Sequence, residues 1–275
     1  MKVGFLTSVF GQRSFDGIVA WASEQKFDAL EVSTHHLPPE RVLDKGEADR
    51  IKANLAQKRI EISSLAHYSN LLLPDTAERA KAVDRFKMVL DAAAALNVKV
   101  VCTMAGMPVP GKSKDQTLRE DFAQVFKPLL KYADASGIKI AMENWYPTLI
   151  QNLELWQLAL DCGEYDNLGF NFDPSHLYWQ GIDYLYAVDE FGNRIFHTHA
   201  KDTEIKADRL RIVGNQVGGW WRYCIPGYGG IQWGQYIARL RGVKYEGVLS
   251  IEHEDWTFTP ETGLIKGRDY LRQLA

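Results

Sequence analysis

The sequence predicts an α/β protein folded as a single (β/α)₈ TIM barrel. Eight short apolar segments alternate with longer segments of helical periodicity, which is typical of parallel strands joined by helices. Most of the short segments are continuous apolar runs, as expected of strands covered on both faces. The 275 residues suit one barrel of roughly 250 residues. No Pro-, Gly- or Ser-rich linker divides them, so we expect one domain over residues 1–275.

The expected strands are bounded by turn residues and are too short for helices. In chain order they are Val3–Ser8, Ala29–Ser33, Glu61–His67, Lys99–Met104, Lys139–Asn144, Leu168–Asp173, Ile195–His199 and Gly247–Glu252. An open doubly wound sheet is the alternative, and it predicts a glycine-rich phosphate loop after the first strand. The segment Thr7–Gln12 is not such a loop. The closed barrel is therefore favoured.

The segments between the strands show helical periodicity. We expect helices over Ser14–Lys26, Ala77–Leu96, Arg119–Ala135, Leu153–Cys162, Trp233–Arg241 and Gly263–Leu274. Two connections, Thr34–Arg59 and Ala200–Glu246, are unusually long for a barrel. We expect residues 201–230 to form a loop over the carboxyl-terminal mouth of the barrel. The alternative is a surface excursion packed by its own aromatic side chains.

Composition narrows the function classes. Lys and Arg total 32 and Asp and Glu 35, for a net charge of -3, and general nucleic-acid or membrane-surface binders normally carry a basic excess. The three cysteines, Cys102, Cys162 and Cys224, are unclustered, so a disulfide framework is not expected. No apolar stretch approaches the roughly 20 residues of a membrane span. We expect a cytoplasmic protein with a small-molecule partner and no nucleic-acid or membrane partner; a homo-oligomer is left open.

Four consecutive strands end in a carboxylate or an imidazole: Glu143, Asp173, His199 and Glu252. Because catalytic groups of a barrel lie at the carboxyl ends of its strands, these four side chains should converge. One imidazole and three carboxylates suit a single divalent cation, with Mn²⁺ as the first expectation and Mg²⁺, Co²⁺ or Zn²⁺ as alternatives. Three buried carboxylates without a cation would repel one another. A network of ion pairs and strand caps is the competing interpretation.

The sequence resembles the xylose isomerase-like barrel superfamily along essentially its whole length. This superfamily includes ketose 3-epimerases, inosose dehydratases, hydroxypyruvate isomerases and the DNA-repair endonuclease IV. The similar motifs are M-E-N at Met142–Asn144, D-x-x-H at Asp173–His176, H-x-K-D at His199–Asp202, G-x-G-x-x-x-W at Gly227–Trp233 and I-E-H-E at Ile251–Glu254.

The resemblance implies roles for particular residues. Glu143, Asp173, His199 and Glu252 would ligate one divalent metal ion. Glu143 and Glu252 would also be the catalytic acid–base pair, and His176 would contact a substrate oxygen. Chemistry supports this assignment, because isomerising or epimerising a ketose removes a proton next to a carbonyl, and a metal ion stabilises the resulting enediolate.

The predicted function is therefore a metal-dependent isomerase or epimerase of a ketose, keto-sugar or polyol ketone. A keto-sugar dehydratase or lyase acting on an inosose or a 3-keto-glycoside would use the same metal site, and no motif separates the two. An endonuclease IV-like phosphodiesterase needs more histidine ligands, and the fourth strand, Val101–Met104, supplies none. A non-catalytic sugar-binding barrel would not need the complete ligand set.

Further residues are candidates for substrate binding: His67, Lys201, Asp202, Trp145 and Arg211. Lys201 and Asp202 could instead orient His199 or pair with each other, and Arg211 could be a solvated loop residue. His253 and Glu254 should lie beside the ligands. Glu31 could form an ion pair either at the floor of the barrel or at its rim. No Lys/Arg cluster accompanies Gly227–Gly230, which favours an unphosphorylated substrate.

Overall fold

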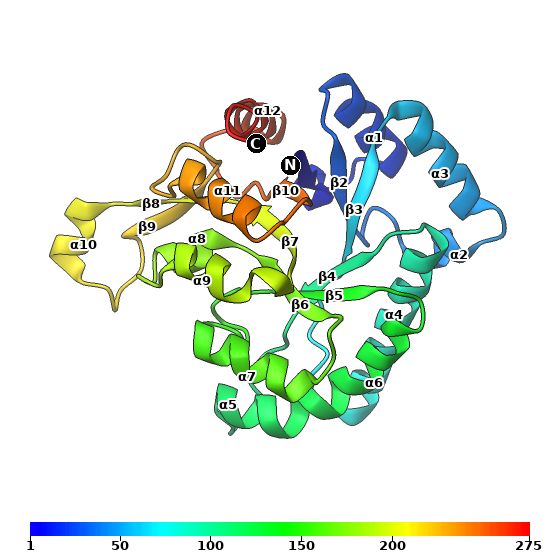
Figure 1. Cartoon of the computed structure of the whole chain (residues 1–275), viewed down its shortest axis with the longest axis horizontal. Coiled ribbons are helices and arrows are strands. Elements are labelled where there is room, and N and C mark those ends of the chain that lie inside the picture. Colours follow the sequence, from blue (N-terminus) through cyan, green and yellow to red (C-terminus); the bar gives the residue numbers. More distant parts are fainter.

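The chain forms a closed barrel of eight parallel strands surrounded by helices, so the predicted fold class is confirmed (Figure 1). The structure, a computed structural model, describes all residues 1–275. Each strand pairs with the next along the chain, and the last barrel strand pairs with the first to close the sheet. The barrel strands are β1 (Lys2–Leu6), β2 (Ala29–Ser33), β3 (Glu61–Ala66), β4 (Val100–Met104), β5 (Lys139–Glu143), β6 (Leu168–Phe172), β7 (Ile195–Ala200) and β10 (Val248–Ile251).

Helices cover the outside of the barrel (Figure 1). They are α1 (Phe15–Glu24), α2 (Pro39–Leu43), α3 (Glu47–Lys58), α4 (Thr76–Ala95), α5 (Lys114–Thr117), α6 (Ala123–Asp134), α7 (Leu153–Gly163), α8 (Pro174–Tyr178), α9 (Tyr184–Phe191), α11 (Trp233–Gly242) and α12 (Pro260–Leu271). A π-helical turn, Leu118–Phe122, begins the helix expected from Arg119. The last helix begins before the expected Gly263, because the Thr259 hydroxyl accepts a hydrogen bond from the Thr262 amide and caps it. None of the helices has the length and apolar character needed to cross a lipid bilayer.

The main core lies between the outer faces of the strands and the helices. Trp156 of α7 stacks on Phe170 of β6 with 4.3 Å between ring centroids and meets Phe172 edge-on at 5.4 Å. Strand β6 also needs Gly169, because a Cβ atom there would collide with the Arg194 carbonyl oxygen of the neighbouring chain segment. These contacts fix the position of β6, which leads directly into the candidate site.

The inside of the barrel has a different character. Its small apolar cluster consists of Leu6, Ala66, Cys102 and Ala141. Such short side chains leave space in the barrel for polar groups, and Glu31 is completely buried there beside histidines of β7. Buried polar groups of this kind need hydrogen-bond partners, and they find them in each other.

Residues 201–230, expected as a loop over the mouth, form an arm instead of an irregular loop. Strands β8 (Asp202–Ile205) and β9 (Trp221–Cys224) pair antiparallel, with α10 (Ala207–Val213) between them. Figure 1 shows α10 extending away from the barrel at the left of the view, whereas the arm begins where β7 ends. Only the base of the arm therefore adjoins the carboxyl ends of the strands.

Candidate active site

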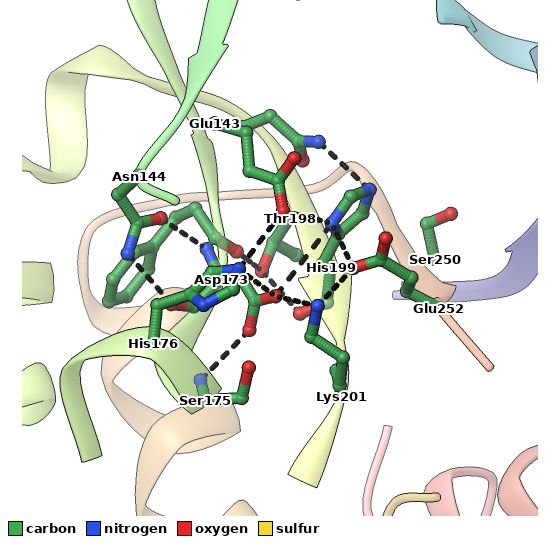
Figure 2. A network of polar contacts seen from close by, with 12 residues as sticks. Glu143, Asn144, Asp173, Ser175, His176, Thr198, His199, Lys201, Ser250 and Glu252 are labelled. Atoms are coloured by element: carbon green, nitrogen blue, oxygen red, sulfur yellow. Dashed lines mark hydrogen bonds and ion pairs between the residues drawn. The ribbon is translucent and has the colours of Figure 1, made fainter. Parts of the chain in front are cut away.

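The structure brings together the four side chains that the sequence predicts as metal ligands. Glu143 ends β5, Asp173 follows β6, His199 lies on β7 and Glu252 follows β10. Each offers a potential ligand atom, and these atoms all lie within 4.8 Å of one another. His199 Nδ1 lies 3.0 Å from Glu252 Oε2 and 3.4 Å from Glu143 Oε1. Figure 2 shows these side chains pointing toward one centre, hereafter the four-residue cluster.

Asp173 is held by the ends of two adjacent strands. Its backbone amide donates to Asn144 Oδ1 at 2.7 Å, and Asn144 Nδ2 donates to the Asp173 carbonyl at 2.9 Å (Figure 2). Asp173 is also the N-cap of α8, because its Oδ1 accepts a hydrogen bond from the Ser175 amide. With Oδ1 occupied in this way, Oδ2 is the oxygen left for the cluster.

The His199 ring is oriented from inside the barrel. Its Nε2 atom lies 3.0 Å from Glu31 Oε2, and Tyr68 donates its hydroxyl proton to the other Glu31 oxygen at 2.8 Å. An ionised carboxylate only accepts hydrogen bonds, so this contact assigns the proton to Nε2. The Nδ1 atom then faces the four-residue cluster, and once it has lost its proton it can offer its lone pair there, as metal-binding histidines commonly do.

Electrostatics make the cluster attractive to a cation. Burial opposes a charged imidazole, but the carboxylates of Glu31, Glu252 and Glu143 outweigh it and raise the pKa of His199 well above its ordinary value. Burial likewise favours a neutral Glu31, yet the neighbouring His199 lowers its pKa to about 2. The same negative field that holds a proton on His199 would hold a metal ion.

The donor atoms fit a divalent cation. His199 Nδ1 and Asp173 Oδ2 are buried and make no hydrogen bond within the protein, although each lies within ion-pair distance of charged neighbours. A cation at the centre of the cluster would satisfy both. Three carboxylates and one imidazole, with no thiolate, are suited to Mn²⁺, Mg²⁺, Co²⁺ or Zn²⁺.

Lys201 adds a positive charge on the Glu252 side of the cluster. Its amine is buried and lies 2.6 Å from Glu252 Oε2, 3.0 Å from Glu254 Oε2 and 3.2 Å from Asp173 Oδ2. Burial disfavours the charged amine, but Asp173, Glu252 and Glu254 outweigh it and raise the pKa of Lys201. Lys201 is therefore a permanent cation beside the ligands. Glu254 takes the place beside them that the sequence predicts.

His176 occupies the Glu143 side. Its Nε2 lies 3.2 Å from Glu143 Oε1 and 3.4 Å from Asp173 Oδ2, and its Nδ1 lies 2.6 Å from the Tyr223 hydroxyl. Tyr223 is on β9, so the base of the arm contacts the site. The two glutamates thus have different neighbours: an imidazole beside Glu143 and an ammonium group beside Glu252.

Asp202 lies next to Lys201 in sequence but faces away from the cluster. Its carboxylate accepts hydrogen bonds from the backbone amides of Gly227 and Ile231 and from the Trp233 indole. Gly229 is needed here because a Cβ atom would collide with the Asp202 carboxylate. Asp202 therefore holds the turn of the G-x-G-x-x-x-W motif; no hydrogen bond or ion pair joins it to Lys201.

The remaining predicted substrate contacts make no hydrogen bond or ion pair with the cluster. Trp145 follows β5 and is 36% exposed, so it is available at the rim. His67 Nδ1 contacts the Thr34 hydroxyl at 2.9 Å, and none of its hydrogen bonds reaches the cluster. Arg211 lies on α10, exposed and paired with Asp208, on the part of the arm that extends away from the barrel (Figure 1). No hydrogen bond or ion pair joins His67 or Arg211 to the four-residue cluster.

Three residues of the site carry no sequence motif. Tyr68 and Asn171 contact Glu31 and His199 inside the barrel, and Tyr223 contacts His176 from the arm. One signal was available for the interior group: His197 and His199 alternate on β7 and so share the inward face. Their partners come from other strands and cannot be paired by sequence spacing.

Comparison with known proteins identifies the family. The profile of the xylose isomerase-like TIM barrel family matches residues 19–274. The uncharacterised protein YfiH of Bacillus subtilis is 29% identical over 312 residues, covering 99% of this chain and 99% of that protein. An inosose dehydratase of Bacillus thuringiensis is 24% identical over 244 residues, covering 82% of this chain and 80% of that protein.

Solved structures share the fold. The probable 3-DHS dehydratase AsbF of Bacillus anthracis superposes with a TM-score of 0.79 at 20% identity, covering 99% of both chains. The D-psicose 3-epimerase of Clostridium cellulolyticum H10, solved with D-tagatose, has a TM-score of 0.77 at 18% identity, covering 100% of this chain and 99% of that one. The IOLI protein, solved with a bound zinc atom, has a TM-score of 0.77 at 19% identity, covering 100% and 99%.

Proposed function

This chain belongs to the xylose isomerase-like TIM barrel family, and we propose that it is a divalent-metal-dependent isomerase or epimerase of a ketose, keto-sugar or polyol ketone. The observation that carries the proposal is the four-residue cluster, whose ligand atoms lie within 4.8 Å of one another and include two glutamates. When bound there, a divalent ion would polarise a substrate carbonyl and stabilise negative charge on its oxygen. Mn²⁺ is the proposed ion.

The two glutamates provide for the movement of a proton. Glu143 is on β5 and Glu252 follows β10, with β6 and β7 between them in the barrel. They therefore reach a substrate from different sides, which suits removal of a proton by one and its return by the other. Burial would raise the pKa of Glu143, but His199 and His176 outweigh it and hold that pKa well below its ordinary value, so the side chain is an ionised carboxylate.

The buried Lys201 supports the same chemistry from the Glu252 side. Its amine lies 2.6 Å from Glu252 Oε2 and keeps its positive charge beside the site. A fixed cation close to the reacting atoms favours the transition state in which a proton has left carbon and negative charge develops. His176 is placed to contact a substrate oxygen next to Glu143, which lies 3.2 Å away.

A keto-sugar dehydratase is the second candidate. The observation in its favour is the group of inosose dehydratases among the curated relatives, one of them aligned over 82% of this chain. Both reactions begin by removing a proton next to a carbonyl, and they differ in whether the carbanion is reprotonated or expels a neighbouring hydroxyl as water. His176 would be the acid that protonates the leaving group.

One experiment tests the proposal and separates the two candidates. The Mn²⁺-loaded protein is incubated in D₂O with ketohexoses, 3-keto-glucosides and inososes, and each reaction is followed by proton NMR and mass spectrometry. An isomerase or epimerase gives a product of unchanged formula carrying one solvent deuterium. A dehydratase gives a product lighter by one water. Absence of both exchange and product across the panel contradicts the proposed function.

A further inference from the structure

A pocket lies between the end of α8 and the arm. It has a volume of about 880 Å³, and six of its ten lining residues are aromatic or carry an amide. These six are Gln151, Tyr178, Trp179, Gln180, Asn215 and Trp220. We refer to it as the outer pocket. Figure 1 shows the arm, formed by β8, β9 and α10, beside α8 at the left of the barrel.

The chemistry of the outer pocket selects a class of ligand. Not one of its lining residues is charged. Phosphate and carboxylate groups are normally bound by Arg or Lys, so an anionic ligand does not match. Aromatic faces bury the apolar side of a ligand, and amides both donate and accept hydrogen bonds. A neutral polyhydroxylated molecule, such as a glycosyl unit, presents both kinds of surface.

A continuous line of side chains joins the outer pocket to the four-residue cluster. Trp179 stacks on Trp221 with 4.6 Å between centroids and 10° between ring planes. Trp221 lies 4.8 Å from the Tyr223 ring, and the Tyr223 hydroxyl lies 2.6 Å from His176 Nδ1. His176 in turn contacts Glu143. The arm therefore contributes to the outer pocket through Trp220 and to the site through Tyr223.

The volume also suits this assignment. Pockets for small molecules range over roughly 300–1,000 Å³, and 880 Å³ accommodates a sugar ring with its hydroxyl groups. We propose that the outer pocket binds the second glycosyl unit of the substrate, so that the substrate class is a keto-glycoside or keto-disaccharide rather than a free ketose. This inference rests on the proposed function for the reacting sugar, but binding at the outer pocket can be measured without turnover.

The test uses a matched pair of exposed neighbours on the arm. Asn215 lines the outer pocket and Gln216 does not. Asn215→Trp should fill the pocket, whereas Gln216→Trp adds the same ring outside it. Both positions are exposed, so neither change disturbs the core. Binding of the non-reactive disaccharides maltose, cellobiose and trehalose is followed by saturation-transfer NMR and by tryptophan fluorescence.

We expect at least one disaccharide to bind, with a dissociation constant raised tenfold or more by Asn215→Trp and changed less than twofold by Gln216→Trp. The same binding should persist in His199→Ala, which lacks a cluster ligand but keeps the outer pocket. Failure of all three disaccharides to bind, or binding that Asn215→Trp leaves unchanged, overturns the inference. The exchange experiment in D₂O tests the proposed function separately, because it measures turnover by the wild-type protein and not binding at the outer pocket.

Discussion

The Nε2 atom of His199 lies 3.0 Å from Glu31 Oε2, and both side chains are completely buried. This contact turns Nδ1 of the same ring toward Glu252 and Glu143. A carboxylate behind a metal-binding histidine fixes the ring and strengthens it as a ligand. We therefore expect Glu31 to position His199 from inside the barrel, and its effect should be measurable on metal binding itself.

The first prediction concerns Glu31→Gln. The amide has the same size and retains an acceptor oxygen, but it removes the negative charge behind His199. We expect Mn²⁺ affinity to fall by about 10–100-fold, the usual effect of removing such a partner. Isothermal titration calorimetry on the metal-free protein measures it.

Ser250→Ala is the matched control for that change. The Ser250 hydroxyl donates to the same Glu31 oxygen at 2.8 Å, so its removal leaves the charge in place. Its effect on Mn²⁺ affinity should be clearly smaller than that of Glu31→Gln. Equal affinities for wild type and Glu31→Gln would show that Glu31 does not position the ligand.

The second prediction is a pH dependence of metal binding. Because the surrounding carboxylates raise the pKa of His199 above 6.5, a proton occupies the imidazole of the metal-free protein below that raised value and must leave before a metal ion can bind. The pKa values of Glu143 and Asp173 are lowered, so these ligands are already ionised. Apparent Mn²⁺ affinity should therefore rise about tenfold per pH unit from pH 5.5 toward the pKa of His199.

Calorimetry in buffers of different ionisation enthalpy should also show one proton released for each Mn²⁺ bound. An affinity that does not change with pH, with no proton released, would contradict the assignment of His199 Nδ1 as a ligand. His199→Ala cannot make the imidazole contact at all. It should bind no stoichiometric metal in elemental analysis while keeping the circular dichroism of the barrel.

The sequence predicts the barrel and the convergence of the four-residue cluster for the same reason. Both depend on strand ends, and strands buried on both faces stand out as continuous apolar runs. Glu143, Asp173, His199 and Glu252 could be chosen because each falls at the end of such a run. The parallel order of the barrel then brings these ends together with no further information.

Residues placed by irregular segments could not be predicted in this way. The H-x-K-D motif puts Asp202 next to Lys201, yet Lys201 follows β7 whereas Asp202 begins β8, and the Asp202 carboxylate binds the Gly227–Trp233 turn instead of the site. Arg211 falls on α10, whose direction depends on the pairing of β8 with β9. Tyr223 reaches His176 only through that same pairing. Sequence spacing could therefore neither exclude Arg211 from the site nor identify Tyr223 as part of it.

The third prediction tests the structural role of Asp202. In Asp202→Asn, an NH₂ group replaces one oxygen of a carboxylate that accepts bonds from Gly227, Ile231 and Trp233, so buried donors lose their acceptor. Each buried donor left without a partner costs about 1–3 kcal/mol, and we expect a loss of roughly 2–5 kcal/mol in urea unfolding. Metal stoichiometry should stay at the wild-type value.

Glu204→Gln is the control on the same strand. Glu204 is partly exposed and pairs with Arg222, and exposed pairs contribute about 0–1 kcal/mol. Its free energy of unfolding should therefore stay close to that of wild type. If Asp202→Asn were equally stable but inactive, Asp202 would contact substrate rather than hold the turn.

The last prediction concerns the two glutamates. Glu→Gln keeps the size of the side chain and one ligand oxygen but removes the base. Each of Glu143→Gln and Glu252→Gln should retain much of its metal, while turnover falls by roughly 10²–10⁴, the usual contribution of a general acid–base residue. Elemental analysis and steady-state rates measure the two effects separately.

The variants should differ in deuterium exchange because the glutamates approach from different strands. Loss of the glutamate that faces the substrate C–H bond should abolish uptake of deuterium from D₂O. Loss of the other should leave uptake in place but stop formation of product, since the proton cannot be returned on the second side. Glu143 lies beside His176, whereas Glu252 lies 2.6 Å from a permanently charged Lys201, so the electrostatic surroundings of the two carboxylates already differ. A wild-type turnover rate in either variant would reduce that glutamate to a ligand. Equal loss of exchange in both variants would show that proton removal needs both carboxylates, which contradicts their assignment to separate sides of the substrate.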